Sequence, residues 1–312
     1  MPKISIIINN YNYESYVYRC ISSAIDQNYS DYEVIIVDDG SQDSSCKIID
    51  QFADRATIIK KTNGGQASAI NAGFAASSGS IIIFLDSDDF LQPNIISSIP
   101  YLFNEGVACV QFLMNVVDAD GATIGVLDNR VRSSSSYSDE LISDGPGNIK
   151  FPPTSGNAWS RKCLEAVMPI KEVDFKISAD AYLFTMIPLE GKIVSSETVL
   201  SNYRIHHNNN YKSSFNIEKA LRNYNIYMSR IRMLSQKINS QTYEDRWIVS
   251  TLYYYSLHVY KNPGKHKIIL TVISSNLSLR KKLLRITVHF LLNLHIYVLT
   301  KFILRKLHDK FN

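Results

Sequence analysis

The chain has 312 residues, of which 45% are hydrophobic and 20% are charged. That composition excludes a disordered chain. The length is sufficient for a large core, and two domains are a reasonable expectation. The formal net charge of +4 is too small to favour nucleic acid as the partner. Four cysteines without a CxxC pair, and an N-terminus without a visible signal peptide, favour reduced thiols in a cytoplasmic protein.

Strand-like and helix-like segments alternate along the first part of the chain. Apolar runs typical of buried strands cover residues 3–8, 32–37, 57–60 and 80–85, and helix-like segments lie between them at 16–27, 44–53 and 66–76. This alternation predicts right-handed crossovers and a mostly parallel sheet flanked by helices. Sheets of this kind bind ligands beyond the carboxyl ends of their strands, so the polar residues that follow each strand are the candidates for a site.

The first two strands are each followed by a polar cluster. Asn9 and Tyr11 follow the first strand, where a tyrosine can stack on a base, although such a cluster is also ordinary turn chemistry. Asp38 and Asp39 follow the second strand, ahead of Gly40. Either carboxylate can accept a hydrogen bond from a base or a ribose hydroxyl, and the residues just after them can equally cap the next helix.

The third cluster combines a lysine with two glycines. Lys61, Asn63, Gly64 and Gly65 lead directly into a helix-like segment. Two glycines before a helix N-terminus let the backbone approach an anion, which the helix dipole favours there. The same residues are also consistent with a flexible connector.

Three carboxylates follow the fourth strand within four positions. Asp86 and Asp88 point the same way along an extended chain, and such close like charges raise one another's pKa unless a cation lies between them. Mg²⁺ and Mn²⁺ prefer oxygen ligands, so this pair predicts a divalent metal shared with substrate phosphates. The alternative is a solvated turn in which Asp89 caps a helix near Pro93. The chain contains neither GxGxxG nor GxxxxGK[ST], which counts against dinucleotide enzymes and P-loop NTPases.

Together these motifs resemble family 2 glycosyltransferases with the GT-A fold, an α/β fold with a Rossmann-like, mostly parallel central sheet. The resemblance covers about residues 3–207 and rests on Ser5–Asn12, Val37–Ser41, Asn63–Gly65 with Asn71–Gly73, and Phe84–Asp89. It implies that the donor contacts come from Asn9, Tyr11, Asp38, Asp39, Lys61, Asn63, Asp86 and Asp88. It further implies that Asp86 and Asp88 form the DxD motif, with Asp88 on a Mn²⁺ or Mg²⁺ ion. Ile70 stands where many members have an arginine, so one contact to the diphosphate is missing. Lys61 is the candidate to replace that contact, and the resemblance does not decide whether it does.

The resemblance also assigns residues of the next hundred positions. Asp180 corresponds to the aspartate that takes the acceptor's proton, although Ala179 replaces the acid that often precedes it. The alternative role for Asp180 is that of a helix N-cap. His206, with His207 as the lesser candidate, can complete the metal shell, although a lone histidine is usually structural. Trp159 is either a platform for the acceptor sugar or a core residue.

After a boundary near residue 215, the residue composition becomes typical of α-helices. Helical segments are expected at 217–234, 243–260 and 265 to the end, so we predict a catalytic domain over 1–215 and a helical C-terminal region over 216–312. The segment 280–310 is basic and strongly apolar. It either contacts an anionic membrane surface, at the inner face of the plasma membrane, or packs on the catalytic domain or a second subunit.

The expected function is that of an inverting glycosyltransferase. It would move a sugar from a nucleotide-diphosphate donor, a UDP-sugar, to a hydroxyl of a saccharide or glycolipid acceptor in cell-surface polysaccharide or glycolipid synthesis. The alternative is a non-catalytic nucleotide-sugar-binding protein on the same fold. A sugar-phosphate nucleotidyltransferase is disfavoured because its glycine- and arginine-rich N-terminal loop is missing.

Overall fold

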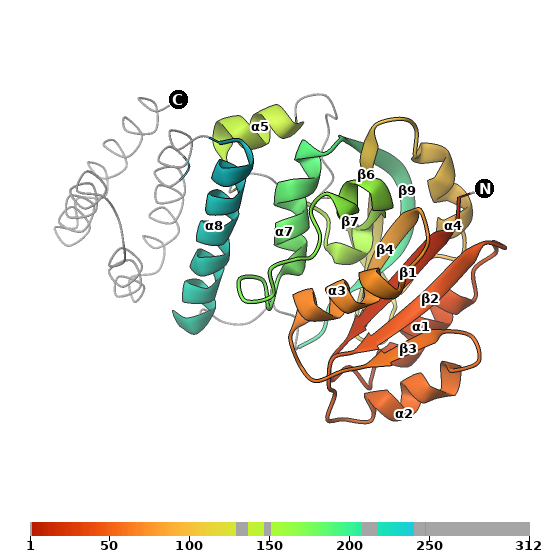
Figure 1. Ribbon diagram of the computed structural model, residues 1–312. Helices are drawn as coiled ribbons and strands as arrows, with labels where there is room; N and C mark the ends of the chain where they lie inside the picture. Colours follow the sequence, from red (N-terminus) through yellow and green to blue (C-terminus); the bar gives the residue numbers. More distant parts are fainter. Residues whose placement is uncertain (1, 129–136, 147–150, 208–216, 240–246, 248–312) are drawn as a thin grey trace. The chain divides into compact units, whose positions relative to one another are not determined.

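The computed structural model describes residues 2–128, 137–146, 151–207, 217–239 and 247 (Figure 1). The chain divides into two compact units, one made of residues 1–138 and 150–212 and the other of residues 139–149 and 213–312. The polar motifs of the sequence all lie in the first unit.

The first unit is built on one mixed sheet. Its strands are β1 (Ile4–Asn10), β2 (Tyr32–Asp38), β3 (Thr57–Lys60), β4 (Ile81–Asp86), β5 (Phe90–Leu91), β6 (Val107–Val117), β7 (Thr123–Leu127), β8 (Asn157–Ser160) and β9 (Lys192–Arg204). Its α-helices are α1 (Val17–Ile25), α2 (Ser45–Ile49), α3 (Gln66–Ala76), α4 (Ile95–Ser98), α6 (Arg161–Glu165) and α7 (Ala179–Met186). Short 3-10 turns are η1 (Asp50–Phe52), η2 (Ile99–Leu102), η3 (Thr154–Gly156) and η4 (Ile187–Leu189).

The order of the strands confirms the predicted, mostly parallel arrangement around the site. Among the described residues the order is β3-β2-β1-β4-β8-β6-β9-β5, with β7 paired to β6. β1 runs parallel to both β2 and β4, and β2 runs parallel to β3. β8 is antiparallel to β4 and β6, while β6 and β9 are parallel.

β1 ends two residues later than the sequence predicted, at Asn10 instead of Ile8, and this extension shapes the site. Asn9 is in register with Asp86 of β4, and Asn10 is in register with Asp38 of β2. The Asn10 side-chain amide donates to Asp38 Oδ1 at 2.8 Å, so a polar pair continues the ladder where the apolar run ends. The carboxyl ends of the three strands are thereby held side by side.

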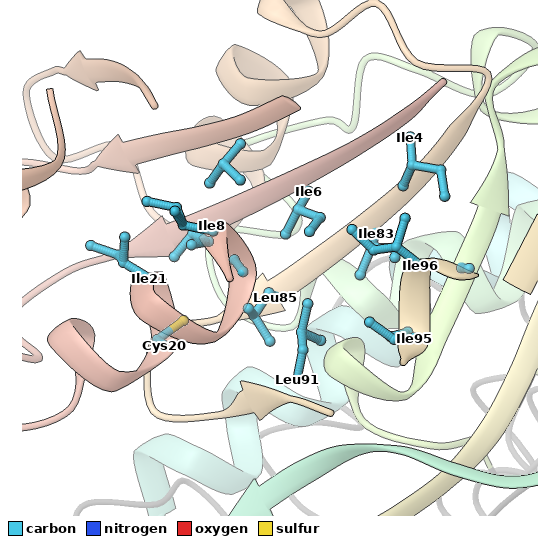
Figure 2. Packing of buried hydrophobic residues seen from close by; sticks show 14 of the residues in the cluster. Ile4, Ile6, Ile8, Cys20, Ile21, Ile83, Leu85, Leu91, Ile95 and Ile96 are labelled. Carbon is cyan, nitrogen blue, oxygen red and sulfur yellow. The ribbon is translucent and has the colours of Figure 1, made fainter. Parts of the chain in front are cut away.

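Alternation along β1 gives the sheet two apolar faces. Ile4, Ile6 and Ile8 are fully buried on one face, where Figure 2 shows them beside Ile83 and Leu85 of β4 and Cys20 and Ile21 of α1. Burying each isoleucine contributes about 2–3 kcal/mol. α3 covers the other face: a Cβ added to Gly73 would lie 2.3 Å from Cγ2 of Ile7, so a glycine is what allows this helix to approach the sheet.

The described residues of the second unit are mainly helical. α5 (Tyr137–Asp144) ends in this unit, and α8 (Ile217–Lys237) contains the predicted helix at 217–234. Trp247 donates its indole N–H to the Ile142 carbonyl at 2.9 Å. None of the described helices has the length and apolar character needed to cross a membrane. The predicted helix at 243–260, Trp247 excepted, and everything after it, including 280–310, lie outside the described residues.

Candidate functional site

Asp86 is the last residue of β4, and its carboxylate lies among polar side chains from other elements. Its Oδ1 accepts hydrogen bonds from the side-chain amides of Asn9, at 3.0 Å, and Gln66, at 3.2 Å. Burial and the nearby charges of Asp88 and Asp180 raise the pKa of Asp86 to about 7, while hydrogen bonds from Asn9 and Thr154 act in the opposite direction. A carboxylate held in this state gains most from an incoming positive charge.

Asp88 and His206 come together although 118 positions separate them in the chain. His206 Nε2 lies 3.0 Å from Asp88 Oδ2, and both residues are buried. The imidazole packs against Tyr16 in a tilted arrangement with ring centroids 4.7 Å apart, and it forms a T-shaped pair with Tyr13 at 6.0 Å. The aromatic rings of the segment after β1 therefore fix the plane of the histidine that faces the carboxylate.

Asp89 ties the turn after β4 to β9 and does not cap a helix. Its Oδ1 accepts the backbone N–H of Arg204 at 2.9 Å. The Arg204 guanidinium in turn donates from Nε to the Asp88 carbonyl at 2.8 Å and from Nη1 to the Ala119 carbonyl at 2.7 Å. Burial, with the charges of Asp88 and Asp86, raises the pKa of Asp89 well above its usual range. This network orients the turn that presents Asp88.

Asp39 meets the glycine loop, a contact that the sequence analysis did not predict. Its carboxylate accepts hydrogen bonds from Lys61 Nζ at 2.7 Å, from the Gly64 amide at 3.0 Å and from the Gly65 amide at 2.6 Å. Lys61 therefore neutralises Asp39 in this structure. Asn63 is exposed beside it, and Tyr11 is 43% exposed at the end of β1.

Asp38 has a different role from the predicted donor contact. It is 1% exposed, and its oxygens accept hydrogen bonds from the Asn10 side chain, the Ser41 amide and the Cys46 thiol. Burial alone would raise the pKa of Asp38, but these hydrogen bonds outweigh it and lower the pKa. The side chain holds the turn after β2 and has no surface left for a nucleoside.

Asp180 lies in the first turn of α7 and is not its N-cap. The preceding Ser178 has a left-handed backbone, with φ of 66°, and its side chain makes no cap bond. Asp180 Oδ1 accepts the Ala181 amide at 2.8 Å. The residue is half-buried, and its effect on the pKa of Asp86 places the two carboxylates within electrostatic reach.

Trp159 is a core residue, and the platform reading is wrong for this structure. The residue lies on β8 with 1% of its surface exposed, and its ring packs 5.6 Å from Phe184 of α7. Phe151 stacks on the same Phe184 at 3.9 Å. Because neither face of the indole reaches solvent, no sugar ring can stack on it.

Gln66 is the site residue that the sequence did not single out. As the first residue of α3, it donates from Nε2 to Asp86 and accepts the Ala179 amide on Oε1 at 3.0 Å. A glutamine directly after two glycines was the available signal, but glutamine is also an ordinary first-turn residue. Only its two partners, 20 and 113 positions away, reveal what it joins.

Comparison with known proteins identifies the family. Residues 5–167 match the sequence model of the family described as Glycosyl transferase family 2. The chain belongs to this family. A glycosyltransferase of Nostoc sp. named as uncharacterized is 40% identical over 220 residues, which cover 68% of this chain and 67% of the relative. The chondroitin synthase of Pasteurella multocida is 38% identical over 129 residues, which are 40% of this chain but only 13% of that enzyme.

Solved structures show that this family 2 glycosyltransferase has the GT-A fold. TarS of S. aureus, residues 1–349 in complex with UDP-GlcNAc, superposes with a TM-score of 0.61 at 16% identity, covering 87% of this chain and 80% of the other. The mannosyltransferase PcManGT of Pyrobaculum calidifontis, in complex with GDP-Man and Mn²⁺, gives 0.55 at 14% identity, covering 97% and 84%.

The donor atoms near Asp88 suit a divalent cation that shares its ligands with a substrate. No three His, Cys, Asp or Glu side chains of the described residues are grouped as a metal site. Asp88 and His206 nevertheless offer a carboxylate oxygen and an imidazole nitrogen 3.0 Å apart, beside the charge-crowded Asp86. Mg²⁺-type sites often take one or two protein carboxylates and fill the rest with waters and substrate phosphates.

Proposed function

We propose that this chain is an inverting glycosyltransferase that moves a sugar from a UDP-sugar to a hydroxyl group of a saccharide or glycolipid acceptor. The observation that carries the proposal is the continuous chain of contacts from Asp39, through the Gly64–Gly65 loop and Gln66, to Asp86 and the start of the helix that bears Asp180. The complexes of TarS with UDP-GlcNAc and of PcManGT with GDP-Man and Mn²⁺ support a nucleotide-sugar donor and a divalent metal.

The nucleoside end of the donor would bind where Tyr11, Asp39 and Asn63 lie. Tyr11 is exposed enough to stack on a base, and Asp39 can exchange one of its amide or ammonium donors for a donor on the base. Ile70 provides no cation to neutralise the diphosphate. The neutralising charge would therefore have to be bound in the Asp86–Asp88 region. A Mn²⁺ or Mg²⁺ ion held there by Asp88 and His206, beside Asp86, would supply the charge that a leaving diphosphate needs.

The transfer itself requires one base, and Asp180 is the candidate. Its carboxylate accepts the proton of the acceptor hydroxyl as the oxygen attacks the anomeric carbon. The bond from that carbon to the diphosphate breaks on the opposite face, so the configuration inverts and the electron pair leaves with UDP. The position of Asp180, in the first turn of α7 and within electrostatic reach of Asp86, supports this role.

Two substitutions test the proposal. Asp180→Asn is expected to abolish transfer but to keep UDP affinity, whereas Asp88→Asn is expected to lower the affinity for UDP with Mn²⁺ as well. The assay is release of UDP or GDP from a panel of nucleotide sugars, followed by calorimetry with UDP. Asp26→Asn, whose side chain is 65% exposed, serves as the matched control and should keep full activity. Full activity in either site variant would remove that residue from the mechanism.

A non-catalytic nucleotide-sugar-binding protein is the second candidate. Ala179 and Ile70, which replace an acid and an arginine common in the family, are the departures that favour it. This candidate predicts UDP binding by the wild-type chain without turnover of any donor. Donor hydrolysis that Asp180→Asn abolishes would exclude it.

We further propose that the enzyme works at a membrane surface in polysaccharide or glycolipid assembly. The basic, apolar segment 280–310 and the similarity to part of a chondroitin synthase support this role. Co-sedimentation of the full chain with anionic vesicles, but not with neutral ones, is the expected result. Equal binding to both or to neither would contradict it.

A further inference from the structure

The N-cap residue of the helix that carries Asp180 makes no side-chain bond to the first amides of that helix. The first amides of a helix lack intrahelical partners and are usually satisfied by the side chain of the N-cap residue. Ser178 occupies that position in a left-handed conformation and makes no such bond. The cap comes instead from another helix, because Oε1 of Gln66 accepts the Ala179 amide at 3.0 Å.

The same side chain reaches the DxD motif with its other end. Gln66 Nε2 donates to Asp86 Oδ1 at 3.2 Å, so one amide group joins Asp86 to the residue that precedes Asp180. An amide is suited to this bridge because it carries an N–H donor and an oxygen acceptor on the same planar carbon at every pH. An ionised carboxylate has no donor for Asp86, and an ammonium group has no acceptor for the Ala179 amide.

The backbones around this bridge are in close contact. The Gln66 amide donates to the Lys176 carbonyl at 2.8 Å, and a Cβ added to Gly65 would lie 2.3 Å from the same oxygen. One turn further along α3, Asn71 exchanges two hydrogen bonds of 2.8 Å with the backbone of Ile170. α3 thus holds the segment before α7 at two points, and only the first of them, Gln66, bonds Asp86.

We propose that Gln66 is a positioning residue, which sets the start of α7, and with it Asp180, at a fixed distance from Asp86. The inference rests on the proposed function, since it assigns Gln66 the task of aligning the base with the donor. Because Gly64 and Gly65 bind Asp39 just before Gln66, one short loop links the nucleoside end of the site to the base. A misplacement of about 1 Å at such a base can cost about 100-fold in rate, so the alignment has a measurable effect.

Three variants of the full chain test the inference. Gln66→Ala removes both bonds. Gln66→Glu keeps an oxygen for the Ala179 amide but places a carboxylate against Asp86. Asn71→Ala, the matched control, removes the hydrogen bonds from α3 to Ile170 and Glu172 of the same segment without touching Asp86 or the start of α7. The measurements are hydrogen exchange of the Ala179 amide, calorimetry with UDP and Mn²⁺, and kcat and KM for whichever UDP-sugar the wild type cleaves.

The expected pattern separates positioning from simple stabilisation. In Gln66→Ala, exchange at Ala179 should rise about 10-fold, the loss expected for a helix cap, and kcat should fall at least about 10-fold. The affinity for UDP should stay within about threefold, because Asn9 and Thr154 still hold Asp86. Gln66→Glu should keep the protection of the Ala179 amide against hydrogen exchange, but its kcat should fall. Asn71→Ala should lower the melting temperature and keep the kcat.

Several results would overturn the inference. One is an unchanged kcat in Gln66→Ala, and another is an equal loss of kcat in Asn71→Ala, which would reduce Gln66 to a structural contact. If the wild-type chain turns over no donor, the proposed function fails by itself. The exchange measurement then still decides the link: faster exchange at Ala179 in Gln66→Ala supports it, and unchanged exchange refutes it.

Discussion

The Glu33 carboxylate holds together the amino ends of the strands whose other ends form the site, and its removal should destabilise the fold in a pH-dependent way. Glu33 of β2 accepts hydrogen bonds from the Lys3 ammonium at 2.9 Å, from the Ser5 hydroxyl at 2.6 Å and from the Ser78 amide at 2.6 Å. Lys3 directly precedes β1, Ser5 is the second residue of that strand, and Ser78 lies just before β4. One side chain therefore joins three neighbouring strands.

The size of the effect follows from the pKa of this group. Burial alone would raise the pKa of Glu33, but the hydrogen bonds from Ser5, Lys3 and Ser78 outweigh it and lower the pKa from 4.5 to about 2. A difference of roughly 2.5 units corresponds to about 3.4 kcal/mol. The side chain is 25% exposed, and screening by solvent reduces the expected contribution to about 2 kcal/mol.

The sign of the pH dependence is determined by the lowered pKa. Because the folded protein binds the proton more weakly than the unfolded chain, the stabilisation is complete above about pH 4.5 and is lost as the pH falls toward 2. We expect Glu33→Gln to unfold in urea with a free energy about 2 kcal/mol below that of the wild type at pH 7, and the difference to close between about pH 4.5 and pH 2. Glu165→Gln, whose side chain is 59% exposed, should show little difference at either pH. A difference for Glu33→Gln that does not change with pH, or is absent at pH 7, would refute this reasoning.

Three further predictions concern the site and the sheet beneath it. His206→Gln should weaken binding of UDP in the presence of Mn²⁺ more than in EDTA, as measured by calorimetry, and equal weakening in both would count against a metal role. Asp86→Asn should abolish donor binding but stabilise the metal-free protein at pH 8, by at most about 4 kcal/mol, because the raised pKa of about 7 makes ionisation of Asp86 unfavourable in the folded state. That gain should disappear as the pH falls from 7 toward 4, and denaturant unfolding at both pH values checks it. Gly73→Ala should destabilise the fold by about 1–3 kcal/mol, since its Cβ would meet Ile7, whereas Gly125→Ala, with nothing within 4 Å, should be close to neutral.

Much of the site could be predicted because parallel strands carry their loops to one edge. Four apolar runs, each followed by a polar cluster, were enough to place Asn9, Asp39, Asp86 and the glycine loop together. The three-dimensional structure then confirmed the parallel pairing of β1 with β2 and β4. Helix α3 and strand β3 begin and end where the pattern put them, because glycines and polar residues interrupt the apolar periodicity on both sides.

The tertiary structure alone decided the different roles of Asp38 and Asp39. Asp38 and Asp39 are adjacent and chemically identical, yet Asp38 is sealed into its own turn by three donors, while Asp39 turns to the glycine loop. Trp159 could be platform or core in the sequence and is core, because β8 is an inner strand of the sheet. Periodicity reports whether a position is apolar, but not which neighbour arrives from another part of the chain.

The sequence by itself therefore determined the fold class and the edge of the sheet where chemistry can occur, since both depend on local patterns that repeat every few residues. The pairings across that edge depended on tertiary structure. His206 meets Asp88 across 118 positions, and Gln66 meets Ala179 across 113. Such contacts depend on how strands and helices that are far apart in the sequence pack together. A hydrogen bond forms only when donor and acceptor are about 3 Å apart, and a pattern of residue types does not determine distances to that precision.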